Sequence, residues 1–454
     1  MPVPNTYSYV TLAQAIAALQ ARLYLGSDAN QQFWTPAELQ AYIVESLKTW
    51  NALTGFWRGE LSFNLQTNTW FYDLTAQSGT PRPFTTTDNL LATLIEYHLL
   101  EPLTDSYPLS WTGSNQFTVA DILDALERAH DAVLGTTFCT LTRSTVACTP
   151  GRIILPDSTL VIRRVAWLPQ PAAFTVKPLE QSDDFTLESF DASWTTAPQG
   201  VPSAWLQSAD PPLGVRLDRT SPCAALLEVL SANSDGSLST TAATTLSVPD
   251  DWAWVEKWGA LADLFAKESL AKDPIREKYC RQRFEEGIGL LSDAPCVLSA
   301  KLNGKPIGVD AIRNGDDFDA GWQAAAPAKP NTVYIAGLNL VAFGPAPDSS
   351  TGYAATLSVV QNQPVPSAAG DPLQIPRDQY DAMLGYAHHL ASVKLGGAEF
   401  LSTVPLYQAF LRAASLYNSR LSEMGYFSKQ MSELSQLQAQ RDPVYSSKKP
   451  EATG

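Results

Sequence analysis

The sequence of 454 residues has little positive charge and little charge overall. Lys and Arg number 31 against 46 Asp and Glu, which gives a formal net charge of −15, and only 17% of the residues are charged. An acidic surface repels phosphate backbones. The composition therefore argues against a protein that reads the grooves of a nucleic acid.

Long apolar runs and cysteine pairs are also missing. No run of 18 apolar residues could span a bilayer, and residues 1–5 lack the basic and apolar regions of a secretion signal. The few cysteines are odd in number and form no CxxC pair, which favours reduced thiols over disulfides. We therefore expect no membrane partner and synthesis in a cytoplasm. The cysteines are Cys139, Cys148, Cys223, Cys280 and Cys296.

The motifs of common enzymes are absent as well. The sequence contains no GxSxG, HExxH, GxxxxGK[ST] or helix-opening GxGxxG. His388 and His389 are adjacent, so on a helix they point about 100° apart and cannot share one metal. Asp pairs such as Asp250-Asp251 fit helix starts and turns better than glycoside hydrolysis. We predict a protein that is not an enzyme, with no catalytic residues, no metal and no cofactor.

Apolar and aromatic residues are plentiful. Hydrophobic residues make up 45% of the chain and 12 residues are Trp, which excludes wholesale disorder. The length suggests about three domains, each large enough to bury a core. The 32 prolines predict many short elements joined by turns.

Two segments share the signature of a helix start. Thr35 precedes Pro36 and Glu38, and Thr118 is followed three residues later by Asp121. A threonine followed three positions on by an acid forms a capping box. An aromatic residue precedes each threonine, Trp34 and Phe117, 83 positions apart. We predict helices from about 36 to 53 and from 119 to 134, each followed by strands.

A second repeat is longer. Residues 190–194 (Phe-Asp-Ala-Ser-Trp) recur as residues 318–322 (Phe-Asp-Ala-Gly-Trp), 128 positions later, and Pro202 recurs as Pro330 at the same spacing. Residues 224–229 resemble 354–359, and residues 248–251 resemble 375–378, at spacings of 130 and 127. Ordered matches at a nearly constant spacing indicate a duplicated module. Each copy is predicted to contain a β-rich half followed by a helical hairpin, at 250–291 and 378–425.

We therefore predict an α+β fold in which helical segments accompany small antiparallel β modules, with an internally duplicated unit of β structure plus helical hairpin. The expected divisions are an N-terminal helical and β unit over 1–110, a first module over 111–300, a second copy over 301–426 and an extended polar arm over 427–454. Within the second hairpin, Pro405 is expected in the first turn of a helix running from 403 to 424.

The order of these motifs resembles the adaptor, or head-to-tail connector, proteins of tailed bacteriophages. The resemblance covers about residues 8–291, and the duplication extends it over 312–425. The chain is longer than a typical adaptor, and the duplication is an addition to the family pattern. The motifs that carry the resemblance are the helix start at Trp34–Leu39, Leu155-Pro156-Asp157, the strand Val161–Trp167, Leu187 and Trp194, Gly200 to Trp205, the strand Leu226–Leu230, Val248-Pro249-Asp250 and the paired helices.

The resemblance implies a structural virion protein in the neck, assembled in the bacterial cytoplasm. Members of the family form a ring under the portal, expected to hold twelve subunits, and join it to tail or other neck proteins. Genomic DNA would pass through the channel without sequence-specific binding. We expect interface roles for the arm residues Tyr445, Lys448 and Lys449, and for Trp194 and Trp322 in the two copies.

Two other functions remain open. The many Trp and the acidic pairs also suit a β-rich protein that binds or hydrolyses carbohydrate, because sugar sites use Trp platforms. However, Trp194 and Trp322 occupy equivalent repeat positions, which favours packing over sugar binding. A tail-tube or baseplate structural protein is the other alternative.

Overall fold

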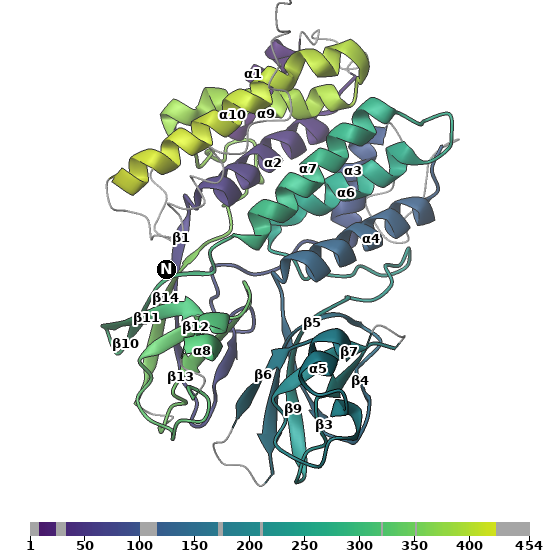
Figure 1. The fold of residues 1–454 in the computed structure, drawn as a ribbon. Helices are drawn as coiled ribbons and strands as arrows, with labels where there is room; N and C mark the ends of the chain where they lie inside the picture. The colour runs from purple at the N-terminus through teal and green to yellow at the C-terminus, as the bar shows by residue number, and fades with distance from the viewer. Residues whose placement is uncertain are drawn as a thin grey trace, which may run out of the picture.

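The computed structural model describes residues 9–23, 33–99, 116–170, 176–208, 212–318, 321–349 and 352–423. Figure 1 shows a layer of helices above two β-sheets that lie side by side. Over the described ranges the chain forms ten α-helices and two mixed sheets, so the α+β class predicted from the sequence is confirmed.

The helices alternate in sequence with blocks of strands. The α-helices are α1 (Leu12–Arg22), α2 (Pro36–Thr54), α3 (Asp88–Leu99), α4 (Val119–Thr137), α5 (Asp184–Phe190), α6 (Ala253–Ala266), α7 (Pro274–Ser292), α8 (Ile312–Phe318), α9 (Tyr380–Val393) and α10 (Gly397–Glu423). Short 3₁₀ turns are η2 (Trp194–Thr196), η3 (Asp250–Trp252) and η4 (Arg377–Gln379).

The two sheets have seven strands each and the same plan. One has the order β1-β14-β10-β11-β12-β13-β2, and the other has the order β3-β9-β5-β6-β7-β8-β4. In each sheet a single parallel pair, β11 with β12 or β6 with β7, is bridged by a short helix, α8 or α5. Every other pair is antiparallel. The duplication predicted from the repeats is therefore present in the topology.

The strands of each sheet have the following bounds. The first sheet contains β1 (Arg58–Asn64), β2 (Phe71–Asp73), β10 (Val297–Leu302), β11 (Lys305–Ala311), β12 (Thr332–Ile335), β13 (Leu340–Gly344) and β14 (Ala354–Val360). The second contains β3 (Thr142–Ala147), β4 (Ile153–Ile154), β5 (Thr159–Pro169), β6 (Lys177–Gln181), β7 (Ala204–Ser208), β8 (Gly214–Leu217) and β9 (Ala225–Asn233).

One copy of the module is nested inside the other. We call α1, α2, β1, β2 and all elements from β10 to α10 copy 1, and the elements from α3 to α7 copy 2. In each copy two helices and two edge strands come first, and a hairpin of two helices comes last. Strands from the expected N-terminal unit 1–110 thus complete the sheet of residues 297–360, so position 110 does not coincide with a sheet boundary.

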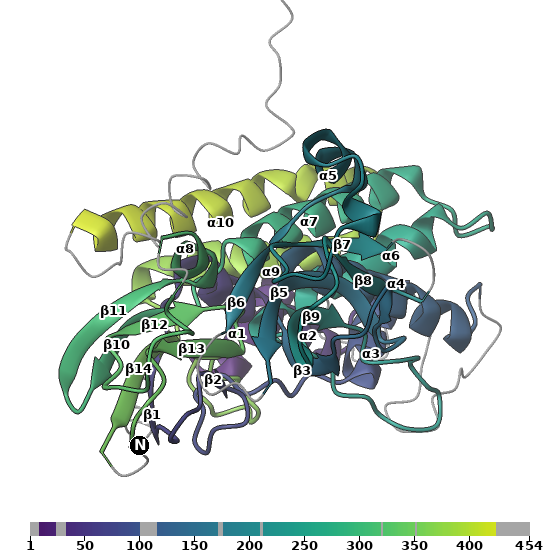
Figure 2. The ribbon, with the colours of Figure 1, turned by 60° about the horizontal axis from the view of Figure 1, so that its bottom comes forward.

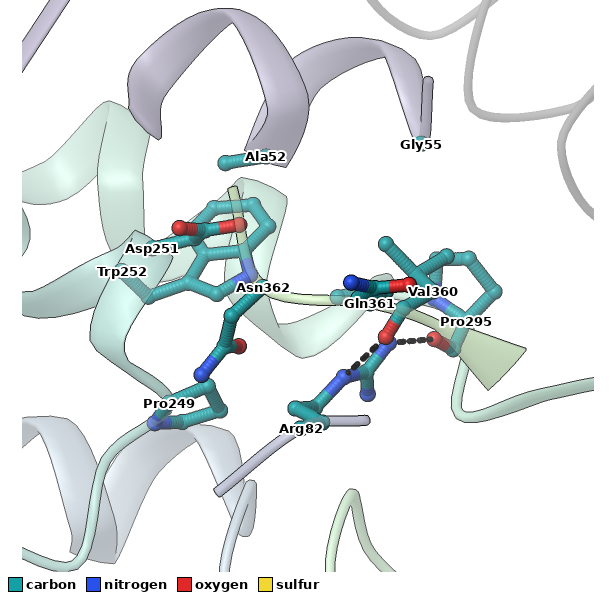
Figure 3. A pocket seen from close by; sticks show the side chains of 11 residues that line it. Ala52, Gly55, Arg82, Pro249, Asp251, Trp252, Pro295, Val360, Gln361 and Asn362 are labelled. Atoms are coloured by element: carbon teal, nitrogen blue, oxygen red, sulfur yellow. Dashed lines mark hydrogen bonds between the residues drawn. The ribbon is translucent and has the colours of Figure 1, made fainter. Parts of the chain in front are cut away.

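The nesting requires the two ends of copy 2 to meet. Arg82, just before copy 2, donates from Nε to the carbonyl of Val360 at 2.7 Å and from a terminal nitrogen to the carbonyl of Pro295 at 3.3 Å. Pro295 lies just after copy 2, so the entering and leaving segments are side by side (Figure 3). Burial lowers the pKa of Arg82. Its guanidinium therefore joins the entering and leaving segments at this crossing.

The capping residues behave as predicted. Thr35 and Thr118 each accept a hydrogen bond from the amide three residues on, and the carboxylates of Glu38 and Asp121 each accept one from the cap amide. Each box satisfies two amide groups that the first turn of a helix leaves without partners. Equivalent caps therefore start α2 and α4, the equivalent helices of the two copies.

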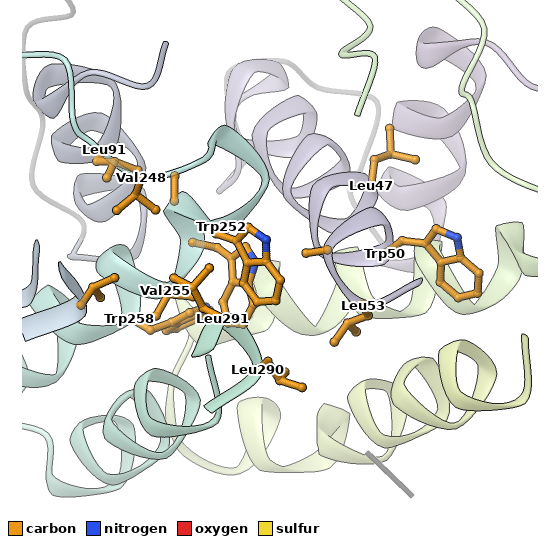
Figure 4. Close-up of a cluster of buried hydrophobic side chains, with 14 of the residues drawn as sticks. Leu47, Trp50, Leu53, Leu91, Val248, Trp252, Val255, Trp258, Leu290 and Leu291 are labelled. Carbon is orange, nitrogen blue, oxygen red and sulfur yellow. The ribbon is translucent and has the colours of Figure 1, made fainter. Parts of the chain in front are cut away.

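The helices of both copies share one continuous hydrophobic core. Trp50 and Leu53 of α2 in copy 1 lie in the same cluster as Trp252, Val255 and Trp258 of copy 2 (Figure 4). A core that extends across both copies excludes water between them, so the two copies pack as one body.

Two local predictions were wrong. The second capped helix was expected to end near residue 134, but α4 continues to Thr137, Phe138 caps it in the left-handed conformation, and β3 starts at Thr142. Pro405 was expected in a first turn, but α10 starts at Gly397 and Pro405 lies inside it. Phe400 is buried against Tyr279 and His389, and this packing favours an earlier helix start than the proline suggests.

Candidate functional site

The described segments contain no group of three or more His, Cys, Asp or Glu side chains that could hold a metal ion. The described helices likewise include none that is long and apolar enough to cross a bilayer. Buried polar groups gather instead where the two copies meet. We call this contact the inter-copy interface. It joins α3, η3, α6 and α7 of copy 2 to α2, α9 and α10 of copy 1.

A buried lysine anchors α6 to α2. Lys257 donates to Glu45 Oε2 at 2.5 Å and lies 3.1 Å from His98 Nε2. Burial lowers the pKa of Lys257, although the Glu45 carboxylate acts in the opposite direction. Burial and the nearby Lys257 cation hold the pKa of His98 well below its usual value. The neutral imidazole can therefore accept a hydrogen bond from the ammonium group.

A buried arginine ties α7 to the second hairpin. Arg283 donates to the Tyr386 hydroxyl at 2.8 Å and to the Tyr407 hydroxyl, and its guanidinium lies 4.2 Å from the Tyr407 ring centroid. It also lies 4.9 Å from the centroid of Trp254 and pairs with Glu286 of its own helix. Removing this cation would leave two buried hydroxyls without a donor.

The acidic pair Asp250-Asp251 connects three distant segments. Asp251 is buried and accepts from Asn51 Nδ2 at 2.6 Å and from the Gln363 amide at 3.0 Å, so it bonds α2 and the segment after β14. Asp250 accepts from the amides of Thr85 and Thr86 at 2.7 and 2.8 Å. Burial raises the pKa of Asp251 to about 6. The pair was predicted to cap a helix start, and it lies at one, but the hydrogen bonds that it accepts come from remote amides and side chains.

At the level of the sheets, one arginine of copy 2 reaches copy 1. Arg164 of β5 pairs with Asp316 of α8 at 2.5 Å and with Glu228 of β9 at 3.2 Å. Trp322 donates to the same Asp316 at 2.9 Å, and the Arg164 guanidinium lies over its ring. The pairing therefore fixes α8 of copy 1 against the sheet of copy 2.

The burial of the equivalent strands β9 and β14 also reflects the contact between the two copies. Residues 227–232 of β9 are all buried, so both faces of this strand are covered. In β14, the equivalent strand of copy 1, burial alternates and Thr356 and Ser358 lie on the open face. A strand covered on both faces lies inside an assembly, whereas an alternating strand borders solvent on one face. Copy 1 therefore covers β9 of copy 2, and copy 2 in turn buries Tyr334 and Leu340 of copy 1, but the Thr356–Ser358 face of β14 stays open among the described residues.

The inter-copy interface is heterologous, because each copy uses a different face. Helix α2 packs on η3 and α3 of copy 2, whereas the described α4, which is equivalent to α2, makes no comparable contact with η4 or α1. The side chains agree: Asn51 and Asp251 bond each other, but their equivalents are Leu134 and Asp378. The chain is thus a pair of modules joined by a heterologous, or head-to-tail, contact. Figure 2, viewed from the sheet side, shows the two sheets beside each other.

A buried histidine stabilises copy 2 internally. His130 of α4 lies 2.6 Å from Glu256 Oε1 and 2.9 Å from Asp235 Oδ2. Burial alone would lower the pKa of His130, but the two carboxylates outweigh it and raise the pKa to about 10. The imidazolium is therefore charged at neutral pH and serves as a structural cation.

The predicted interface residues have different surroundings. Trp322 is buried in an apolar cluster that contains residues of both copies, and Trp194 is buried in copy 2 beneath Arg216. Buried indoles cannot present a face to a sugar ring, so the packing interpretation of both residues fits their surroundings. Tyr445, Lys448 and Lys449 lie outside the described residues.

The roles of Lys257, Arg283 and Arg164 were not predicted from the sequence. One signal was available: Lys257 follows Trp254 and precedes Trp258 within an otherwise apolar helical face. A lone cation among aromatic residues indicates a buried partner, because such a charge is rarely buried unpaired. The identity of that partner, 212 positions away at Glu45, could not be read from the spacing.

No family model matches the chain, and no curated protein matches it at a significant level.

Two further surface features stand out. A groove of about 360 Å³ with mostly apolar walls runs between α2 and α3 and reaches Trp254 of α6. Phe190 at the end of α5 and Phe318 at the end of α8 are 86% and 87% exposed. The two phenylalanines occupy equivalent positions although the rest of each helix has diverged.

Proposed function

We propose that the protein is a structural subunit of a tailed-bacteriophage neck, where it forms a ring that connects the portal to the tail. The observation that carries this proposal is the heterologous, side-by-side packing of two equivalent modules in one chain. A heterologous contact that repeats generates a closed ring when the rotation between successive modules closes. The order of sequence motifs that resembles the adaptor proteins supplies the particular place in the virion.

The exposed phenylalanines support a second contact to a neighbouring component. Phe318 stays exposed although its helix already packs on copy 2 through Ile312 and Asp316. Phe190 is exposed at the same place in copy 2. An apolar side chain presented identically by both copies suits a partner with repeated sites, such as another ring.

The acidic composition fits a channel protein. A net charge of −15 disfavours phosphate binding, so DNA could pass such a surface without adhering to it. Neutral or basic residues on the inner wall of an assembled ring would contradict this part of the proposal.

Binding to purified portal rings tests the function. The full chain is mixed with portal, and the complexes are imaged by negative-stain electron microscopy. We expect density at one end of the portal, and weaker occupancy for the double variant F190S/F318S. A chain that ignores portal at micromolar concentration would contradict the proposal.

The arm gives a separate test. Removing residues 430–454 is expected to leave the fold intact, because the described core ends at α10, but to reduce assembly on portal. Circular dichroism checks the fold and microscopy checks assembly. Undiminished assembly of the truncated chain would exclude a role for the arm.

A further inference from the structure

The inter-copy interface uses one face of each copy, and among the described residues the equivalent face of the other copy has no module packed against it. Copy 2 binds copy 1 through α3, η3, α6 and α7, and the equivalents of these elements in copy 1 are α1, η4, α9 and α10. Copy 1 binds copy 2 through α2, α9 and α10, and the equivalents in copy 2 are α4, α6 and α7. The copy 1 face of one molecule and the copy 2 face of another could therefore form a second contact of the same kind as the inter-copy interface.

We propose that these two free faces bind a second copy of this chain, with Asp381 of α9 opposite Arg128 of α4 in the next molecule. The proposal names the subunit contact of the ring proposed above. The geometry that supports it comes from the interface already present within the chain.

The position of each residue follows from its equivalent. The capping boxes place α2 and α4 in register at a spacing of 83, so Glu45 corresponds to Arg128. The turns η3 and η4 place α6 and α9 in register at a spacing of 127, so Trp254 corresponds to Asp381. Glu45 and Trp254 line one groove in the inter-copy interface. Arg128 and Asp381 therefore line the equivalent groove, one from each molecule, if the contact repeats between molecules.

The charges on the two faces are complementary. The Asp381 side chain is 88% exposed beside Arg22, and the Arg128 side chain is 62% exposed and lies 3.0 Å from Asp263. Bringing the faces together places these charges in the alternating order Arg22, Asp381, Arg128, Asp263. Such an arrangement favours association in one register and disfavours contact between like faces.

The second contact is more polar than the first. The charged side chains of the first contact, Lys257 and Glu45, are buried, whereas Asp381 and Arg128 of the second are exposed. The open face of β14 also presents Thr356 and Ser358 where β9 is covered by copy 1. Exposed ion pairs are screened by salt. We therefore expect reversible self-association that weakens as ionic strength rises.

Charge exchange tests the contact. Sedimentation velocity of the full chain is measured for wild type, D381R, R128D and an equimolar mixture of the two variants. Each variant alone brings like charges together, so its dissociation constant should rise about tenfold. In the mixture, every junction again joins opposite charges, and association should recover. The control is R313D, which alters an exposed, ion-paired arginine on α8 away from both faces and should associate as wild type does.

The outcomes separate this contact from the proposed function. A wild-type chain that stays monomeric at all concentrations, single variants that associate normally, or a mixture that does not recover would each overturn the contact. Self-association with recovery in the mixture, but no binding to portal, would support the contact and contradict the neck function. Portal binding that needs neither Asp381 nor Arg128 would support the neck function and contradict this contact.

Discussion

His130 is held between two carboxylates that belong to different segments of copy 2, Asp235 and Glu256. Because its pKa is about 10 in the folded chain and near 6.5 in an unfolded one, the folded state binds an extra proton between these values. The stabilisation is complete below about pH 6.5 and is lost as pH rises towards 10.

Replacing this histidine should remove that pH dependence. We expect H130Q to lower the free energy of unfolding by about 3 kcal/mol at pH 7, since a buried ion pair loses one partner, and to flatten the decline between pH 7 and 10. Thermal unfolding followed by circular dichroism across this range measures both effects. The control H388Q changes a half-buried histidine without a carboxylate partner among the hydrogen bonds of the described residues, and it should keep the wild-type slope.

Lys257 and Glu45 give a second prediction at the same scale. K257M leaves the Glu45 carboxylate buried without its cation and should cost about 3 kcal/mol. The double variant E45L/K257M replaces the pair by apolar groups and should recover most of that loss. Urea unfolding of the single and double variants measures the difference, and equal destabilisation of both would show that the ion pair is not the source.

The sequence pointed to some residues of the candidate site and not to others. The acidic pair at 250–251 and the tryptophans at 194 and 322 were visible because they recur or cluster along the chain. Arg164 and Arg283 were not, since their partners Asp316 and Tyr386 come from the other copy. Only the arrangement of the two copies shows that these charges are paired.

At the scale of elements, the two capping boxes make a matched pair of probes. T35A and T118A each remove the side chain that accepts the amide of the third residue of a helix, and each should cost about 1 kcal/mol. Denaturant unfolding measures the loss. T136A alters an exposed threonine near the end of α4 that accepts no amide hydrogen bond among the described residues, and it should change stability by less than either.

Helices with strong start signals were predictable, and elements fixed by remote packing were not. The starts of α2 and α4 follow from local hydrogen bonds between residues three apart. The start of α10 depends on Phe400 packing against Tyr279 of another copy, and no local signal encodes that contact. The repeats revealed the duplication, but the pairing of β1 with β14 could not be read from either strand alone.

At the scale of the whole molecule, copy 2 is a continuous stretch whose ends lie together at Arg82 and Pro295. A polypeptide of residues 84–294 should therefore fold alone, with its own seven-stranded sheet and helices. We expect a cooperative thermal transition at a lower temperature than in the full chain, because the faces of α6 and α7 that bind copy 1 become exposed. A polypeptide without such a transition would show that copy 2 needs copy 1 to fold.

The nesting of copy 2 also sets an order for synthesis. A ribosome releases β1 and β2 first, but their partners β14 and β13 emerge only after all of copy 2. Domains generally fold as units while the chain grows. Copy 2 can therefore fold before the second segment of copy 1 has been synthesised. Once folded, copy 2 holds residues 82 and 295 beside each other. The two segments of copy 1 then meet without the entropy cost of closing a flexible loop of more than two hundred residues. The inserted module thereby acts as an assembly aid for the module that contains it.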